Sequence, residues 1–196
     1  MKKWMAFLLA LLMLALPALA EVPERVQVEE NVYRLTVEET GEVLLLTVDA
    51  EGNPLRLETE VPAQVEAAGE QSREGAEEVV RQEYPTGRVL SAQLTEDGSR
   101  ALAVLADDLC GMIEVCGEAI VSRALEYGEF AEDGMLTESG AMAAMRLLRS
   151  EANIVELELD EDDGALVYEG EACIGDVEYE FELNAHTGKL LEWEAD

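Results

Sequence analysis

Residues 177–191 read VEYEFELNAHTGKLL, the pattern of two β-strands joined by a tight turn. Every second residue from Val177 to Leu183 is apolar, and the residues between them are glutamates. Such alternation is typical of a half-buried strand with one apolar face and one wet face. The next four residues, AHTG, are small or turn-forming, and apolar residues follow them. The stretch therefore predicts a hairpin that exposes its carboxylates.

The residues on either side extend this hairpin into a sheet with one helix. Alternating segments occur at residues 154–159, 165–174 and 189–194. Ahead of them, Ala141, Met142, Ala144, Met145 and Leu148 have the three-to-four spacing of one helix face. Residues 135–196 are thus predicted to form one helix followed by an antiparallel meander of four strands.

The chain resembles itself at an offset of 65 residues. Ser72–Val104 aligns without a gap on Thr137–Glu169, and Ser72 and Thr137 both suit a helix N-cap. In the earlier copy an apolar helix pattern ends at Pro85. Its later strands are expected at 100–109 and 112–122, with a less certain register. This comparison predicts a repeated helix-on-sheet unit.

The amino-terminal part has strand patterns at 25–29, 33–39, 42–49 and 55–61, without a convincing helix. Polar connections of small residues at 62–69 and 127–134 are the candidate boundaries. The expected domains are residues 21–62 as N-terminal strands of a partial repeat, 70–130 as a first repeat and 135–196 as a second.

The order of these elements resembles the PepSY domain. The resemblance lies in the apolar helix with a central Ala, the strand 154–159, the acidic turn after it, and the run 179–191. That run is similar to a closing signature of a Tyr-rich strand followed by Asp/Asn-Ala-x-Thr-Gly-Lys/Glu-x-Leu. The middle copy lacks the Ala-x-Thr-Gly turn, which leaves its last strands in doubt.

The resemblance implies an α+β fold of tandem cystatin-like units, each a helix packed on an antiparallel β-meander. It also implies an exported bacterial module that is not an enzyme. Family members occur in propeptides of thermolysin-like metallopeptidases and in cell-envelope proteins. The implied partner is therefore a protein, either an extracytoplasmic peptidase that the module inhibits or regulates, or an envelope protein.

Residues 1–20 are predicted to be a secretory signal peptide. Lys2 and Lys3 precede an apolar run of about a dozen residues, which ends in Pro17 and an Ala-x-Ala site. An uncleaved anchor has a similar pattern, but Pro17 and the small residues favour cleavage before Glu21. We expect a secreted or envelope-associated protein with no stable membrane insertion after cleavage.

The net charge limits the class of partner. The chain has 13 Lys and Arg against 44 Asp and Glu, which gives a formal net charge of -31. Phosphate backbones are bound by clustered cations, so nucleic acid is excluded as a partner. The acids alternate with apolar residues along strands, which indicates solvated sheet faces.

Catalytic constellations are not expected. His186 is the only histidine and lies in a predicted surface turn. The three cysteines, Cys110, Cys116 and Cys173, lack the spacing of a zinc site. A bridge between Cys110 and Cys116 stays open, although reduced, buried thiols are favoured. We predict no catalytic and no cofactor-binding residues.

Calcium is the alternative ligand. Asp160, Asp162 and Asp163 crowd one turn, but the spacing around Gly164 fails the EF-hand pattern. They are candidates for a weak Ca2+ site only. An acidic envelope protein that binds Ca2+ or has a structural role is therefore the second hypothesis for function.

Aromatic residues on the sheet are the candidate partner contacts. Tyr168, Tyr179 and Trp193 are predicted to border an open sheet face, where they could anchor a protein partner. The competing interpretation is ordinary core filling, because all three occupy alternating strand positions.

Overall fold

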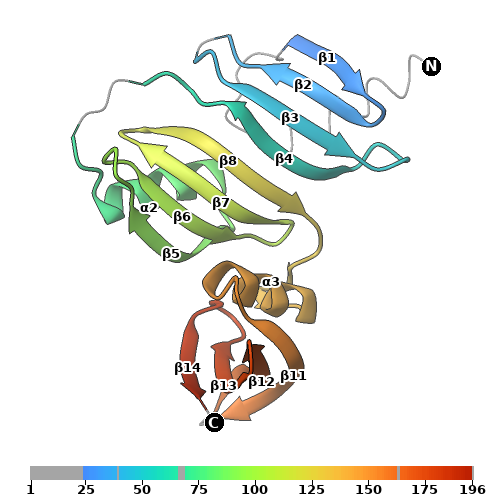
Figure 1. The fold of residues 1–196 in the computed structure, drawn as a ribbon, viewed down its shortest axis with the longest axis vertical. Coiled ribbons are helices and arrows are strands. Elements are labelled where there is room, and N and C mark those ends of the chain that lie inside the picture. The colour runs from blue at the N-terminus through green and yellow to red at the C-terminus, as the bar shows by residue number, and fades with distance from the viewer. Residues whose placement is uncertain (1–23, 39, 66–68, 163, 196) are drawn as a thin grey trace. The chain divides into compact units, whose positions relative to one another are not determined.

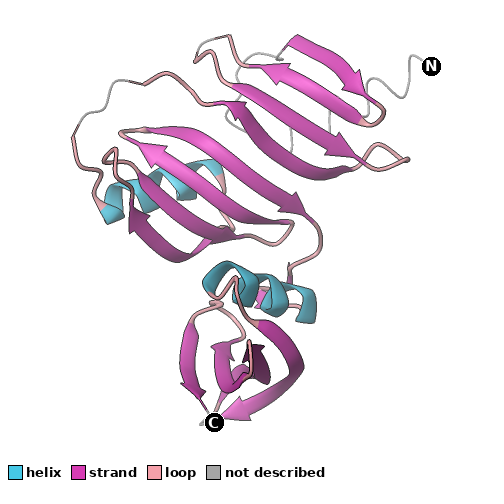
Figure 2. Ribbon diagram, viewed as in Figure 1, coloured by secondary structure: helices cyan, strands magenta, loops and turns pink. Residues whose placement is uncertain are grey.

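The computed structural model describes residues 24–38, 40–65, 69–162 and 164–195, and they form an α+β protein (Figures 1 and 2). This confirms the fold class expected from the sequence; the predicted signal peptide lies outside the described residues. The elements in chain order are β1 (Glu24–Glu29), β2 (Val32–Thr36), β3 (Val43–Val48), β4 (Pro54–Val61), α2 (Arg73–Glu83), β5 (Arg88–Leu94), β6 (Arg100–Leu105), β7 (Leu109–Cys116), β8 (Ala119–Tyr127), β9 (Ala131–Glu132), β10 (Met135–Leu136), α3 (Glu138–Leu148), β11 (Asn153–Asp162), β12 (Ala165–Ile174), β13 (Val177–Asn184) and β14 (Leu190–Ala195).

Strands β1 to β4 form an antiparallel meander, as their alternating sequence predicts. Leu35 pairs with Leu44, and Leu46 pairs with Leu57. All four leucines are buried, while the residues between them in β3 are only half-buried. One face of this meander is therefore core, and the other remains accessible.

The two helices follow the 65-residue offset of the sequence. Each spans eleven residues, and β5, β6, β11 and β12 also begin at positions 65 apart. The hydroxyl oxygens of Ser72 and Thr137 accept hydrogen bonds from the backbone N–H of Gly75 and Gly140, both at 3.1 Å. These are the N-caps that the sequence predicted.

The strands after β6 correct the sequence-based expectation. Instead of two strands at 100–109 and 112–122, the chain turns at residues 106–108 and again at Gly117, whose φ is +61°. Residues 102–106 are all buried, so this part lacks the alternation that would have marked strand ends. The eight strands β1 to β8 hydrogen bond in the order β1-β2-β3-β4-β8-β7-β6-β5.

The C-terminal sheet has the order β11-β12-β13-β14, antiparallel throughout, and α3 lies on one face of it (Figure 1). The short hairpin β9–β10 occupies part of the predicted connection 127–134. Its flanking residues Phe130 and Leu136 are buried in the same core as α3. The predicted connection is thus partly structural.

The described chain divides into two compact units. One contains the residues up to Pro85 together with Gln93–Ala101 and Ile113–Tyr127, and the other contains Thr86–Ala92, Leu102–Met112 and the residues from Gly128 onward. Neither helix of the described ranges has the length and apolar character that a bilayer span requires.

Candidate functional site

One face of the C-terminal sheet is covered by two rows of glutamates, which we call the acidic face. Antiparallel register places four glutamates side by side in each row, one from every strand. The first row is Glu156, Glu171, Glu180 and Glu194, and the second row is Glu158, Glu169, Glu182 and Glu192. Directly opposed side chains lie about 5 Å apart at Cβ, so each row concentrates like charge.

The acidic face surrounds an open hollow of about 550 Å³. Its lining includes seven of the eight glutamates together with Asp160, Leu159, Gly170 and Phe181. The pKa of Glu182 is raised, first by desolvation and then by the negative charges of Asp162, Glu169 and Glu192. Accumulated negative charge therefore raises the free energy of this face, and a cationic group would relieve it.

The opposite face of the same sheet carries the core. Phe181 and Leu183 of β13 are buried there with Ala144 and Met145 of α3. Gly170 pairs with Phe181, and a Cβ at position 170 would lie 2.7 Å from Cζ of that ring. The glycine thus makes room for the phenyl ring across the strands.

Tyr168 does not lie on an accessible surface, which corrects its predicted role as a partner contact. It is 6% exposed, and its hydroxyl donates a hydrogen bond of 2.9 Å to the Leu136 carbonyl oxygen. The physical reason is its phase along β12, which it shares with Leu166 and Ala172 of the core. That shared phase was the sequence signal that could have placed it correctly.

Tyr179 and Trp193 are half-buried and contact each other. Their rings are stacked with centroids 4.7 Å apart, and the Arg149 guanidinium carbon lies 5.2 Å from the centroid of the Trp193 ring. Phe181 lies next to Trp193 at 6.2 Å. The stack extends the core to the β14 edge, and a partner-binding role for these two residues stays a prediction.

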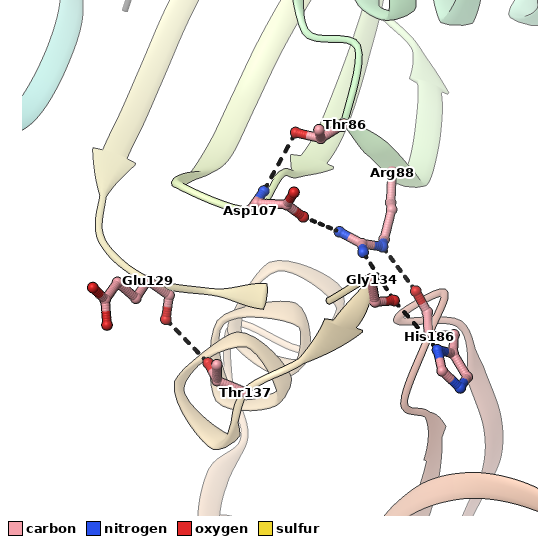
Figure 3. A network of polar contacts seen from close by, with 7 residues as sticks. All are labelled: Thr86, Arg88, Asp107, Glu129, Gly134, Thr137 and His186. Atoms are coloured by element: carbon pink, nitrogen blue, oxygen red, sulfur yellow. Dashed lines mark hydrogen bonds and ion pairs between the residues drawn. The ribbon is translucent and has the colours of Figure 1, made fainter. Parts of the chain in front are cut away.

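The turn between β13 and β14 is held by Arg88 of β5 (Figure 3). The Nε of Arg88 donates to the His186 carbonyl oxygen at 2.7 Å, and one terminal nitrogen donates to the Gly134 carbonyl oxygen at 3.3 Å. The other terminal nitrogen forms an ion pair of 3.3 Å with Asp107. One arginine therefore joins three separate segments of the C-terminal unit.

The same turn is also ordered from within. The side-chain oxygen of Asn184 accepts hydrogen bonds from the backbone N–H groups of His186 and Thr187 at 3.1 and 2.9 Å. Gly188 has a φ of +67° and packs close to Leu90. His186 itself is exposed, as the sequence predicted. This arrangement gives the Asn-Ala-x-Thr-Gly signature a structural role.

The candidate calcium ligands lie at the end of β11. Asp160 and Asp162 are exposed, and Asp163 is outside the described residues. In the described part of the chain, no three His, Cys, Asp or Glu side chains are grouped so that they could hold a metal ion.

All three cysteines are free thiols. Cys110 and Cys116 lie on the same strand, β7, where six residues extend over about 20 Å. Because bridged cysteines have Cα atoms about 5.5 Å apart, this strand geometry prevents a bond between them. Cys110 is buried, and Cys173 is half-buried.

A buried ion-pair cluster in the other unit has no counterpart in the sequence-based predictions. One terminal nitrogen of Arg123 lies 2.6 Å from a Glu42 carboxylate oxygen, and the other lies 3.5 Å from Glu83 at the end of α2. Burial raises the pKa of Glu83, although Arg123 opposes the shift, and raises the pKa of neighbouring Tyr84 to about 12. Only the pairing of β4 with β8 brings these groups together, so no local pattern could have revealed them.

Comparison with known families identifies the C-terminal segment. The family model described as "Peptidase propeptide and YPEB domain", PepSY, matches residues 136–194. This segment is a PepSY domain. Its helix is α3, its sheet is β11 to β14, and the acidic face and the Arg88-bound turn both belong to that sheet.

Two solved structures are similar to the chain as a whole. The Bacillus megaterium YpeB C-terminal domain is 11% identical, with a TM-score of 0.40, and the match covers 97% of this chain and 96% of that one. A candidate lipoprotein from Clostridium difficile 630 is 14% identical, with a TM-score of 0.30, over 62% of this chain and 90% of that one. No curated protein matches in sequence.

Proposed function

We propose that the protein is an exported, non-enzymatic binding module of the PepSY type, which restrains an extracytoplasmic peptidase. The observation that carries the proposal is the match of residues 136–194, which begins within β10 and spans a full helix and its four-stranded sheet. The signal-peptide pattern of residues 1–20 supports an extracytoplasmic location.

The module is proposed to contain two related units. Helix α2 and its following strands begin 65 residues before α3 and its strands, with equivalent N-caps. We interpret residues 70–130 as a PepSY-like repeat and residues 21–62 as a partial one, each cystatin-like in arrangement. Tandem units would give the protein more than one surface for a peptidase.

The test is inhibition of a thermolysin-like metallopeptidase by the mature chain beginning at Glu21. Hydrolysis of a short fluorogenic peptide is followed while the chain is titrated in, and a saturable fall in rate is expected. Gly140→Ala, which disturbs the PepSY domain, is expected to weaken inhibition, whereas the matched variant Gly75→Ala is expected to retain it. An unchanged rate with the wild-type chain, together with no complex in size-exclusion chromatography, would overturn the proposal.

A calcium-binding or structural role is the second candidate, favoured by the hollow lined with carboxylates. Since the described residues offer no grouped ligand set, such binding would be diffuse and weak. Titration calorimetry with CaCl2 tests it: heat that saturates supports the role, and the absence of heat removes it.

A further inference from the structure

Strand β11 is an open edge of the PepSY sheet. It is ten residues long, Asn153–Asp162, and it hydrogen bonds to β12 on one side only. Eight of its ten residues are exposed, so side chains do not cover it. An edge strand has unpaired backbone N–H and C=O groups, and an extended peptide can satisfy them by joining the sheet.

The residues of β11 determine which peptide can join. Glu156, Glu158 and Asp160 point to the acidic side, while Leu157 and Leu159 alternate with them on the other side. Leu159 is 47% exposed, and Val155, next to the bulge near the start of the strand, is 59% exposed. A fifth strand would therefore place every second residue beside a carboxylate and the residues between beside apolar side chains.

A second copy of this chain does not suit the edge. Strand β11 contains Glu156, Glu158, Asp160, Glu161 and Asp162 and no Lys or Arg. Pairing two such strands would bring carboxylates opposite carboxylates, which is destabilising. The same charge attracts a cationic strand, so the edge discriminates between itself and a basic partner.

The other edge of the sheet is less suitable. Strand β14 has six residues, and its Trp193 already stacks with Tyr179 and contacts the Arg149 guanidinium. A cation therefore already lies beside this edge, and its main aromatic surface is occupied. Strand β11 offers a longer edge without either feature.

We propose that β11 binds an extended segment of a partner protein, in which Lys or Arg alternates with apolar residues, as a fifth strand of the PepSY sheet. The proposal deepens the proposed function, on which it rests, by naming the chemistry of the bound segment. Main-chain hydrogen bonds supply affinity, while Glu156, Glu158 and Asp160 select for cations on one side of the segment.

The test uses a synthetic ten-residue peptide of alternating Lys and Val, capped at both ends and labelled for fluorescence anisotropy. Saturable binding to the mature chain is expected, and it should weaken as NaCl is raised. Two further peptides carry N-methyl groups, one on the Lys residues and one on the Val residues. Only one of them should lose binding, because alternate backbone N–H groups face the β11 edge.

Two matched variants locate the binding site. Glu158→Lys and Glu192→Lys change the net charge equally, at opposite ends of the same glutamate row. Glu158→Lys should weaken binding about tenfold, and Glu192→Lys about twofold through long-range charge alone. Circular dichroism checks that both variants fold, and the N-methylated peptides give a readout that leaves the protein unaltered.

Three results would overturn the inference: no saturable binding, equal binding of both N-methylated peptides, or equal losses in the two variants. The last two would indicate diffuse electrostatic adsorption. Peptidase inhibition that persists in Glu158→Lys would also count against β11 as the site while leaving the proposed function intact. Failure of the inhibition assay with intact peptide binding would remove the peptidase and leave the edge site standing.

Discussion

Helices α2 and α3 share their local sequence code and differ in what they pack against. Both have eleven residues, and in both the C-cap N–H, of Tyr84 or Arg149, donates to a carbonyl at 2.7 Å. Yet α3 buries five residues, and α2 buries only Ala76 and Val80. The difference teaches that helix boundaries are set locally, whereas the stability of each helix depends on its tertiary contacts.

The glycines at equivalent positions should separate the two helices most strongly. A Cβ at Gly140 would lie 1.8 Å from the Phe130 carbonyl oxygen, whereas at Gly75 it would meet only the side chains of Ser72 and Gln71. Gly140→Ala should therefore lower the free energy of unfolding by about 4 kcal/mol. Gly75→Ala should change it by less than about 1 kcal/mol, since helix propensity offsets the displaced hydroxyl. Urea denaturation measures both, and equal effects would contradict the packing difference.

The next largest effect is expected at the end of α2. Glu83 there is paired with Arg123, whereas the equivalent residue of α3 is the apolar Leu148. Arg123→Met should cost about 3 kcal/mol, because it leaves the buried Glu42 carboxylate without its cation. The double variant Arg123→Met/Glu42→Gln should recover part of that loss. A single variant as stable as the wild type in urea denaturation would show that the cluster contributes little.

Smaller changes are expected at the N-caps. Ser72→Ala should cost about 0.5–1 kcal/mol. Thr137→Ala should cost more, about 1–2 kcal/mol, because its hydroxyl also donates to the Glu129 carbonyl oxygen at 3.0 Å. Thermal unfolding followed by circular dichroism ranks the pair. The reverse ranking would mean that this additional bond does not stabilise α3.

The smallest effect concerns pH. The pKa of Glu182 in the folded protein lies above its ordinary value of 4.5, so the folded state holds this proton more tightly than the unfolded state. Its contribution to stability is therefore present below the ordinary value and is lost as pH rises through the folded pKa. Glu182→Gln should flatten this part of the pH profile of the unfolding midpoint. An unchanged profile would contradict the proposed strain of the acidic face.

Salt should distinguish Glu182 from Glu83, whose pKa is raised chiefly by burial. Part of the shift at Glu182 comes from neighbouring carboxylates, so added NaCl should screen that part. The corresponding slope assigned to Glu83, by comparison with Glu83→Gln, should be less sensitive to salt. Equal salt sensitivity would argue that neighbouring charge does not set the difference.

Local patterns predicted the elements whose causes are local. The N-caps Ser72 and Thr137, the C-terminal meander and the turn at Gly188 follow from hydroxyl positions, alternation and small turn residues. The division of residues 109–127 into β7 and β8 was missed because burial there removes the alternating pattern. Pairing of β4 with β8 joins strands far apart in sequence and has no local signal.

The candidate site could be predicted only in part. Alternation identified exposed carboxylates on individual strands, but the two glutamate rows depend on the register between four strands. The placement of Tyr168 was wrong because the covering position of α3 decides which face is accessible. The β11 edge likewise follows from strand order, which a single sequence leaves open.

The most direct test of the account is hydrogen–deuterium exchange of the mature chain with and without a thermolysin-like peptidase. The account predicts that the peptidase slows amide exchange within residues 136–194, most strongly in residues 153–162. Slower exchange confined to residues 24–61, with residues 136–194 unchanged, would contradict the claim that the PepSY domain binds the partner.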